Sequence, residues 1–564
     1  MSRRRDLAWL GLGAVALLGA GLGMREPWPA DEPRFALIAR DMLANGSWFV
    51  PMAGGDLYAD KPPVFFWAIA AMLALTGSLQ VAFLLPALLA GLGTLWLVYD
   101  LARRVWSHGV GIAAACLLLF TVQFTLQAKT AQIDGFLVFW TTLGLYGIAR
   151  HLLLGPDWRW YAIGGFAAGI GVITKGVGFL PLLLPLVASL LARTAGVAFP
   201  GRAPGGGSRW ALAPLAALAA ICLWFVPMLV QVAASGDPAY AAYRDEILFK
   251  QTVTRYAQAW HHHKPFWFYF AEVLPTLWLP AIALLPWAVP RWREHWRGRD
   301  GRALLFLAWA LVVVLFFSFS SGKRGVYVLP AVPAFVLALA PFLPELWRRA
   351  GVQRLAAVLA IVLGLVLAAA AGLLPRLRPE LLAELRDTHG VVSLAPLWAV
   401  AAVALVAVAA FRFRRGAYAL AATLAAAWLV KGFWIDPMID DERSAHSFMA
   451  RAESMVPADR EFGLLAYREQ FLLQSTRPSV NFGHARWKEG MAEVHDGARW
   501  LNAAPGRVLL VSAGHREACF AAAPARLVGE AGRQQWFLVE GPHADPACAA
   551  HGSAATVRHY RPAL

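Results

Sequence analysis

The sequence predicts a helical membrane protein that crosses the bilayer many times and ends in a polar α/β domain. Hydrophobic residues make up 59% of the 564 positions and charged residues only 15%, too few for a soluble globule of this length. Apolar runs of about 18–23 residues recur along the chain, and each can cross a hydrocarbon core of about 30 Å. From about residue 436 these runs stop, and Gly, Pro and charged residues become frequent.

About thirteen membrane-spanning helices are predicted from the apolar runs. The first follows three arginines at 3–5 and covers 7–24, and its length favours a retained span over a cleaved signal peptide. The run 64–77 is too short to cross and is expected to lie along the interface. The other spans are 79–101, 108–127, 136–153, 159–174, 176–195, 209–233, 273–290, 302–319, 326–344, 352–374, 394–411 and 416–434.

Arginine occurs in every second connection between these spans, which predicts an orientation. The arginine-rich connections are 3–5, 103–104, 150–159, 193–209, 291–302, 348–354 and 412–415. Because Arg and Lys favour the cytoplasmic side, we expect the N-terminus inside and the C-terminus outside. The loops 25–62 and 236–272 then lie outside, between parts of a membrane domain 1–435, with a soluble domain 436–564 on the same side.

The domain 436–564 is predicted to mix strands and helices. Short apolar stretches at 508–511 and 536–539 are typical of strands, and 444–455 is typical of a helix. Cys519 and Cys548 could form a disulfide in an oxidising compartment, and their spacing leaves the pairing open. Cys116 and Cys222 lie in apolar runs and are most simply small hydrophobic residues.

Charge and motifs exclude two classes of partner. The net charge of +16 comes from arginines scattered over short loops rather than gathered on one face, so nucleic-acid binding is excluded. The chain has no Walker A motif, and the glycines at 169 and 171 lie in a membrane span, where they allow close helix packing. We therefore expect no nucleotide.

Ionisable residues next to outer span ends are candidates for function, because charge beside a membrane span is costly. The loop 25–62 contains Asp31 and Glu32, which could also be a solvated acidic turn. Asp134 begins a span, where a carboxylate also caps a helix N-terminus; capping and catalysis are compatible.

Cations on the same side predict a phosphate site. The candidates are Lys61, Lys175, Lys323, Arg244 and Arg255. Arg binds phosphate oxygens in a bidentate manner and Lys acts as a point charge; ordinary anionic headgroups are the alternative ligand. Of the histidines at 261–263, His262 and His263 are the metal candidates, although adjacent side chains cannot all point one way. A divalent cation is left open.

Several short motifs, in this order, resemble a known family. They are the acidic pair at 31–32, Asp-Lys-Pro-Pro at 60–63, Gln-x-Asp at 132–134, Thr-Lys-Gly at 174–176, Arg-Tyr at 255–256, His-Lys-Pro-x-Trp at 263–267 and the segment 322–330. Over roughly residues 1–340 the chain resembles the lipid A 4-amino-4-deoxy-L-arabinose transferases, which are GT-C type membrane glycosyltransferases related to protein O-mannosyltransferases. The segment 323–327 lacks the proline of the family's usual Gly-Lys-Leu-Pro-x-Tyr.

The resemblance implies a reaction and a place. The donor would be undecaprenyl phosphate carrying aminoarabinose, the acceptor a lipid A phosphate, and the site the periplasmic face of a bacterial inner membrane. The implied catalytic residues are Asp31 and Asp134. The implied ligands of the donor phosphate are Lys61, Arg255, Lys175 and Arg244, and the implied pocket residues are Glu32, Arg34, Tyr58, Asp60 and Tyr327.

The chemistry of such a transfer suits these residue types. Displacement at an anomeric carbon passes through an oxocarbenium-like state that carboxylates stabilise, and cations offset the charge of the leaving phosphate. A phosphate acceptor is already ionised, so Asp31 would orient and stabilise, whereas for a hydroxyl acceptor it must act as a base. The alternatives are transfer of another sugar to a protein or glycan, and a transporter, which predicts midplane charges and repeated halves that the sequence lacks.

Overall fold

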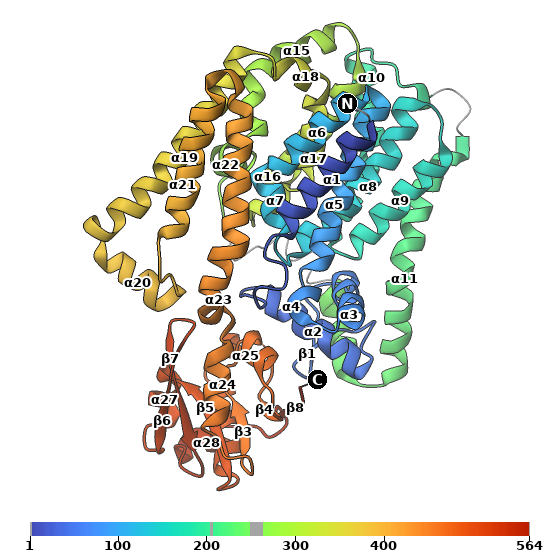
Figure 1. The fold of residues 1–564 in the computed structure, drawn as a ribbon. Coiled ribbons are helices and arrows are strands. Elements are labelled where there is room, and N and C mark those ends of the chain that lie inside the picture. The colour runs from blue at the N-terminus through green and yellow to red at the C-terminus, as the bar shows by residue number, and fades with distance from the viewer. Residues whose placement is uncertain (1–2, 203–206, 249–262, 485, 563–564) are drawn as a thin grey trace.

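A computed structural model describes residues 3–202, 207–248, 263–484 and 486–562 as a helical bundle joined to a six-stranded sheet domain (Figure 1). Within the described residues, seven helical stretches are long and apolar enough to cross a membrane. They are α4–α5 (Leu79–Val105), α8 (Ile133–Leu154), η1–α10 (Gly176–Thr194), η3–α11 (Gly207–Ser235), α16 (Gly301–Phe319), α19 (Ala350–Leu377) and the continuous stretch Phe413–Ser454, which contains α22 (Gly416–Val430), α23 (Asp436–Ser444) and α24 (His446–Ser454).

Two further spans are bent. The helix α6 (His108–Phe120) meets α7 (Val122–Ala128) at 71°, and the stretch Tyr269–Leu277 (η5 and α14) meets Ala281–Arg297 (η6 and α15) at 99°. The backbone N–H of Val122 donates to the carbonyl oxygen of Leu279 over 2.9 Å, so the two bends face each other. Pro280, which has no N–H to donate, lies at the second bend.

The predicted count of thirteen spans is therefore not confirmed: the described residues hold seven, or nine if each bent pair is one span. Hydropathy marks apolar segments but not where a helix breaks or how long it is. The other predicted spans are the shorter helices α1 (Arg3–Gly19), α9 (Trp158–Val172), α17–α18 (Ala331–Leu346) and α21 (Ala395–Phe411).

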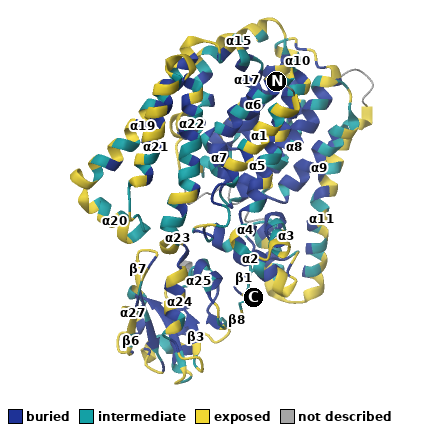
Figure 2. Cartoon of the chain, viewed as in Figure 1, coloured by how far each residue is buried: buried dark blue, intermediate teal, exposed yellow. Residues whose placement is uncertain are grey.

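The buried centre of the bundle consists of α5 (Leu85–Val105), α6, α8 and α17 (Ala331–Leu339). The helices α19 and α21 instead expose much of their surface (Figure 2). A glycine sets one close helix contact, as the sequence predicts. A Cβ on Gly169 of α9 would lie 2.3 Å from the carbonyl oxygen of Ala217 in α11, so only glycine lets these helices approach.

The arginine-rich connections gather at the end of the bundle that holds the N-terminus, and the sheet domain lies at the other end (Figure 1). Polar contacts tie these connections together. His108 lies 3.2 Å from Asp6, and Arg291 lies 2.5 Å from Glu345. The position of these connections at one end of the bundle agrees with the alternation read from the sequence.

The C-terminal domain contains a six-stranded sheet in the order β6-β7-β5-β3-β4-β8. The strand β3 is parallel to β4 and β5, and the other pairs are antiparallel. The stretches predicted as strands are β5 and β7. The strands are β3 (Glu461–Leu464), β4 (Ser479–Asn481), β5 (Arg507–Ser512), β6 (Ala525–Ala531), β7 (Gln534–Glu540) and β8 (Arg558–Tyr560). The helices are α25 (Glu469–Gln474), α26 (Ala492–Asn502), α27 (Ala513–Cys519) and α28 (Pro546–Ala550). Cys519 and Cys548 form a disulfide.

The loop 25–62, which is the first loop expected on the outer side and is called the first outer loop below, shares one hydrophobic core with the sheet domain. The loop forms α2 (Glu32–Asn45), a hairpin of β1 (Met52–Ala53) and β2 (Asp56–Leu57), and it leads into the short apolar helix α3 (Val64–Thr76). Phe35 and Phe66 belong to the same buried cluster as Phe471 and Trp536, and α25 lies beside α2 (Figure 1). The sheet domain is therefore packed onto the loop that contains Asp31.

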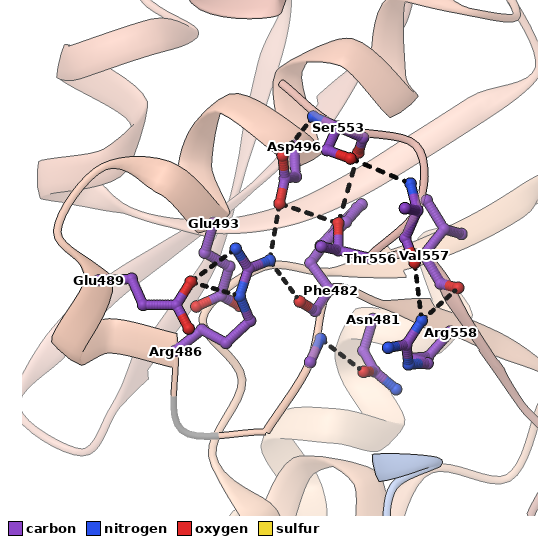
Figure 3. Close-up of polar contacts among 12 residues, drawn as sticks. Asn481, Phe482, Arg486, Glu489, Glu493, Asp496, Ser553, Thr556, Val557 and Arg558 are labelled. Atoms are coloured by element: carbon purple, nitrogen blue, oxygen red, sulfur yellow. Dashed lines mark hydrogen bonds and ion pairs between the residues drawn. The ribbon is translucent and has the colours of Figure 1, made fainter. Parts of the chain in front are cut away.

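Polar contacts close the end of the chain onto α26 (Figure 3). The buried Asp496 accepts hydrogen bonds from Arg486, from the Ser553 N–H and from the Thr556 hydroxyl. Arg558 then pairs with Asp56 of the hairpin at 2.8 Å. These contacts hold β8 against both the sheet and the first outer loop.

We predict that Glu493→Gln removes a pH-dependent loss of stability from the C-terminal domain. Burial raises the pKa of Glu493 to about 7, although the Ala466 N–H partly offsets it. Ionisation of Glu493 therefore lowers the free energy of unfolding above pH 7, by up to about 3 kcal/mol. This loss disappears as the pH falls towards the pKa of Glu493 in the unfolded chain. Amide exchange of Ala492–Asn502, corrected for intrinsic rates, should show more protection at pH 6 than at pH 8 in the wild type and no such difference in the variant. The same pH difference in both proteins would contradict the prediction; Glu461→Gln, at an exposed site, is the control.

Candidate active site

Asp31 lies at the start of α2 on a half-buried surface. It is the N-cap residue, yet its side chain makes no capping hydrogen bond. Its two oxygens face two arginines instead: Oδ1 lies 4.0 Å from Arg34 Nη1 and Oδ2 lies 3.7 Å from Arg324 Nη2. At these distances the ion pairs are loose, and the side chain is 24% exposed. Asp31 is thus held by charge but remains open to a ligand.

Arg34 connects Asp31 to the sheet domain. Its Nε donates to Glu469 Oε1 over 2.7 Å, and Tyr58 lies close enough to act on the charge of the guanidinium. Burial opposes the charged guanidinium, but Glu469 and Tyr58 outweigh it and raise the pKa of Arg34. The predicted pocket residues Arg34 and Tyr58 are therefore brought together one turn from Asp31.

Glu32, the neighbour of Asp31, is buried in a structural ion pair. Its carboxylate accepts two hydrogen bonds from Arg25, at 2.5 and 2.8 Å, and one each from the backbone N–H groups of Trp28 and Ala131. The side chain is 8% exposed. Glu32 thus joins the loop before α2 to the segment that leads into Asp134, and its oxygens are already satisfied.

Asp134, Lys175 and Tyr327 form a second group. Asp134 lies in the first turn of α8, and its Oδ1 lies 2.6 Å from Lys175 Nζ. The same ammonium lies 4.5 Å from the ring centre of Tyr327. The residue at the N-cap of α8 is Gln132, so the first-turn carboxylate of Asp134 serves the ion pair rather than a cap. Three predicted site residues from separate parts of the chain are in contact here.

The segment 322–328 joins the two groups. Arg324 pairs with Asp31, and Tyr327 three residues later meets Lys175. Buried side chains hold this segment from behind: Gln123 donates to the carbonyl oxygen of Gly325 over 2.7 Å, and Tyr269 donates to that of Arg324 over 3.3 Å. Tyr327 contacts Lys175 although this segment lacks the proline that is usual in the family.

Tyr58, Asp60 and Lys61 lie at the end of the first outer loop. Tyr58 is 3% exposed and lies between the rings of Phe66 and His484, at 5.9 and 6.0 Å. Burial and the charge of Asp60 raise the pKa of Tyr58. Lys61 Nζ donates to the carbonyl oxygen of Asp60 over 3.1 Å. A cation and a carboxylate thus follow the tyrosine that contacts Arg34.

Of the cations predicted to bind phosphate, Lys323 and Arg244 pair with other groups, and Arg255 lies outside the described residues. Lys323 is buried and donates to the carbonyl oxygens of Lys264 and Ser320, at 2.9 and 2.5 Å, so its neighbour Arg324 supplies the cation of this segment. Arg244 of α12 (Pro238–Asp245) pairs with the adjacent Asp245. Arg255 lies in the segment 249–262, which the structure does not describe.

The metal candidates gain no support from the described part of the chain. His263 forms an isolated backbone bridge with Gly322, and His262 lies outside the described residues. In the residues that were described, the single cluster of three potential metal ligands is His495, Cys519 and Cys548. Its two sulfurs are joined in the disulfide, so they are not thiolates.

Two site residues were not predicted, whereas Arg324 lies in the motif segment 322–330, next to the candidate cation Lys323. Glu469 and His484 come from the sheet domain, and His484 Nε2 lies 2.9 Å from Glu469 Oε1. No local pattern around 469 or 484 marks them, because their partner Arg34 is more than 400 residues away in the chain. The site combines two carboxylates, several cations and tyrosines, which suits transfer from a phosphate leaving group.

The chain is similar in sequence to known glycosyltransferases. Residues 60–204 match the family model of dolichyl-phosphate-mannose-protein mannosyltransferases. The chain is 32% identical over 336 residues to an undecaprenyl phosphate-alpha-4-amino-4-deoxy-L-arabinose arabinosyl transferase of Edwardsiella ictaluri, an alignment that covers 57% of this chain and 56% of that protein. It is 31% identical over 455 residues to the transferase of the same name from Pseudomonas aeruginosa, with 76% and 75% covered.

The fold matches a solved structure along its whole length. The crystal structure of ArnT from Cupriavidus metallidurans bound to undecaprenyl phosphate superimposes with a TM-score of 0.76. The match covers 97% of this chain and 100% of that chain, at 19% sequence identity. The helical bundle and the C-terminal sheet domain are thus one shared architecture.

We predict that Glu32→Gln destabilises the protein while Asp31→Asn does not. Removing the charge of Glu32 leaves Arg25 buried without its main partner, which costs about 3–5 kcal/mol. Asp31 has loose, partly exposed ion pairs, so its neutralisation should change stability by less than about 1 kcal/mol. Thermal unfolding in detergent measures both. Equal unfolding temperatures for the two variants would contradict the structural role of Glu32.

Proposed function

The chain belongs to the family of undecaprenyl phosphate-alpha-4-amino-4-deoxy-L-arabinose arabinosyl transferases, and on this basis we propose that it is a glycosyltransferase that uses a polyprenyl-phosphate-linked sugar. The donor is 4-amino-4-deoxy-L-arabinose on undecaprenyl phosphate, and the acceptor is a phosphate group of lipid A. The alignment with the first relative covers 56% of that protein, so the activity of the whole chain is a proposal.

One observation carries the proposal: Asp31 and the Asp134–Lys175 pair are joined through the segment 322–328. Arg324 faces Asp31 while Tyr327 faces Lys175, so a ligand beside one group lies near the other. Transfer from a sugar phosphate requires negative charge near the anomeric carbon and positive charge near the leaving oxygens. These two groups supply both kinds of charge at the start of α2 and α8.

The proposed roles follow from position. Lys61 and Lys175 neutralise the leaving phosphate, and Arg255, which lies outside the described residues, joins them by the family resemblance. Asp31 stabilises the positive charge that develops on the sugar ring and orients the acceptor, which as a phosphate is already ionised near neutral pH. Asp134 holds Lys175 in place through their 2.6 Å ion pair.

The proposed location is the inner membrane of a bacterium, with the site on the periplasmic side. Arginine-rich connections lie at the end of the bundle away from the site, which supports a cytoplasmic N-terminus. The disulfide between Cys519 and Cys548 suits a C-terminal domain in an oxidising compartment. We retain the division into a membrane domain 1–435 and a soluble domain 436–564 as part of this proposal.

Mass spectrometry of lipid A tests the function directly. Cells that express the protein and make the donor should gain the mass of one or more aminoarabinose groups on lipid A, and cells with Asp31→Asn should lose this product by about 10²–10³-fold in rate. Equal membrane levels of both proteins are the control. An unchanged lipid A would overturn this acceptor, and a labelled glycan or protein in the same cells would point to another acceptor.

We predict that Lys61→Met weakens binding of undecaprenyl phosphate alone. A charge-assisted hydrogen bond to phosphate contributes about 1.5–3 kcal/mol, so the dissociation constant should rise about 10- to 100-fold. Titration of the purified protein in detergent measures this without turnover. Arg378→Met is the matched control, since Arg378 is an exposed cation at the outer end of α19 that pairs with Glu380. An equal loss in both variants would mean that the lipid responds only to general positive charge.

A further inference from the structure

We propose that Glu469 and His484 of the C-terminal domain are positioning residues for Asp31, acting through Arg34. The proposal rests on the proposed function, because it assigns a part in that reaction to a domain that lies outside the membrane bundle. In this view the sheet domain completes the site rather than merely covering it.

The contacts form a continuous chain from the sheet domain to Asp31. His484 Nε2 lies 2.9 Å from Glu469 Oε1, and the same oxygen accepts from Arg34 Nε over 2.7 Å. Arg34 Nη1 lies 4.0 Å from Asp31 Oδ1. Each of these side chains is less than one quarter exposed, so water screens the contacts only in part.

Arg34 is fixed by three partners from different parts of the fold. Glu469 holds Nε from the sheet domain, Tyr58 lies beside the guanidinium from the first outer loop, and Asp31 lies 4.0 Å from Nη1. Without Glu469 the guanidinium would be free to move onto Asp31 and form a tight ion pair. Glu469 therefore keeps Asp31 available, because it takes the larger share of the charge of Arg34.

Glu469 keeps its charge over the working pH range. Burial opposes ionisation, but the hydrogen bond from His484 and the charge of Arg34 outweigh it and lower the pKa of Glu469 to about 2. An ionised carboxylate only accepts hydrogen bonds, so His484 donates through Nε2. The backbone N–H of His484 is in turn held by Asp56 over 2.6 Å, which anchors the ring to the hairpin of the first outer loop.

Packing between the sheet domain and α2 also holds Glu469 next to Arg34. Glu469 is the first residue of α25, and α25 packs on α2, whose first turn contains Arg34. Phe471 of α25 and Phe35 of α2 belong to one buried cluster. Glu469 and Arg34 are therefore held next to each other by packing, and a change of charge at 469 acts on the guanidinium without moving the helices.

A double-mutant cycle tests the proposal on the full-length protein. Glu469→Gln should lower kcat about 10- to 100-fold with a change in KM for the donor of less than about 3-fold, since it misplaces a group rather than removing a ligand. Arg34→Gln should also lower kcat, because Asp31 then loses the guanidinium that holds Oδ1, and the double variant should be no worse than Arg34→Gln alone. His484→Gln, whose amide can still donate to Glu469, should keep activity that His484→Ala loses.

The control and a second readout separate positioning from folding and from the function itself. Glu453→Gln changes an acid that bonds to Ser475 and Thr476, just beyond the other end of α25, and should leave kcat unchanged. The rate at which a carbodiimide labels Asp31, measured by mass spectrometry, should change with Glu469→Gln in the wild type but not in the Arg34→Gln background.

The possible outcomes differ clearly. A wild-type kcat in Glu469→Gln, additive losses in the double variant, or an equal loss in Glu453→Gln would each overturn the proposal. If the wild-type protein transfers no sugar, the proposed function fails, and the labelling cycle still decides whether Glu469 acts on Asp31 through Arg34.

Discussion

The buried ion pair between Arg25 and Glu32 is the constraint on which the site depends. Two charges out of water are stable only when their hydrogen bonds are complete, and Glu32 completes its set with the backbone N–H groups of Trp28 and Ala131. Burial opposes the charge of Arg25, but Glu32 outweighs it and raises the pKa of the guanidinium. One carboxylate thereby fixes the start of α2 relative to the segment before α8, and so places Asp31 and Asp134 at one end of the bundle.

Two adjacent acids have opposite roles because of helix geometry. Successive residues at a helix start point about 100° apart, so Glu32 can face the core while Asp31 faces the ligand side. Glu32 is satisfied by short, buried contacts, whereas Asp31 has two arginines at nearly 4 Å. The same division separates Lys323 from Arg324, where one cation supports the backbone and its neighbour faces Asp31.

The sequence predicted the membrane class, the sheet domain and most of the residues that meet near Asp31, because apolar length, charge alternation and short ordered motifs are local properties. It did not predict which of two neighbouring residues faces inward, as with Lys323 and Arg324, since both have the same charge. It also missed Glu469 and His484, whose role depends on the packing of residues more than 400 positions apart. The count of thirteen spans is not confirmed in the described residues, because two predicted spans bend at Thr121 and Pro280 and four others are shorter helices.

The core shared by the first outer loop and the sheet domain has a consequence for biogenesis. Phe35, Phe66 and Asp41 emerge early during synthesis, yet their partners include Trp536 and Tyr560, which emerge at the very end. Contacts of such high sequence separation form late, and their exposed apolar surface must be protected until then. The loop that contains Asp31 is therefore synthesised early but completed last, so a nascent chain gains its finished site only after its final strand, β8, has been made.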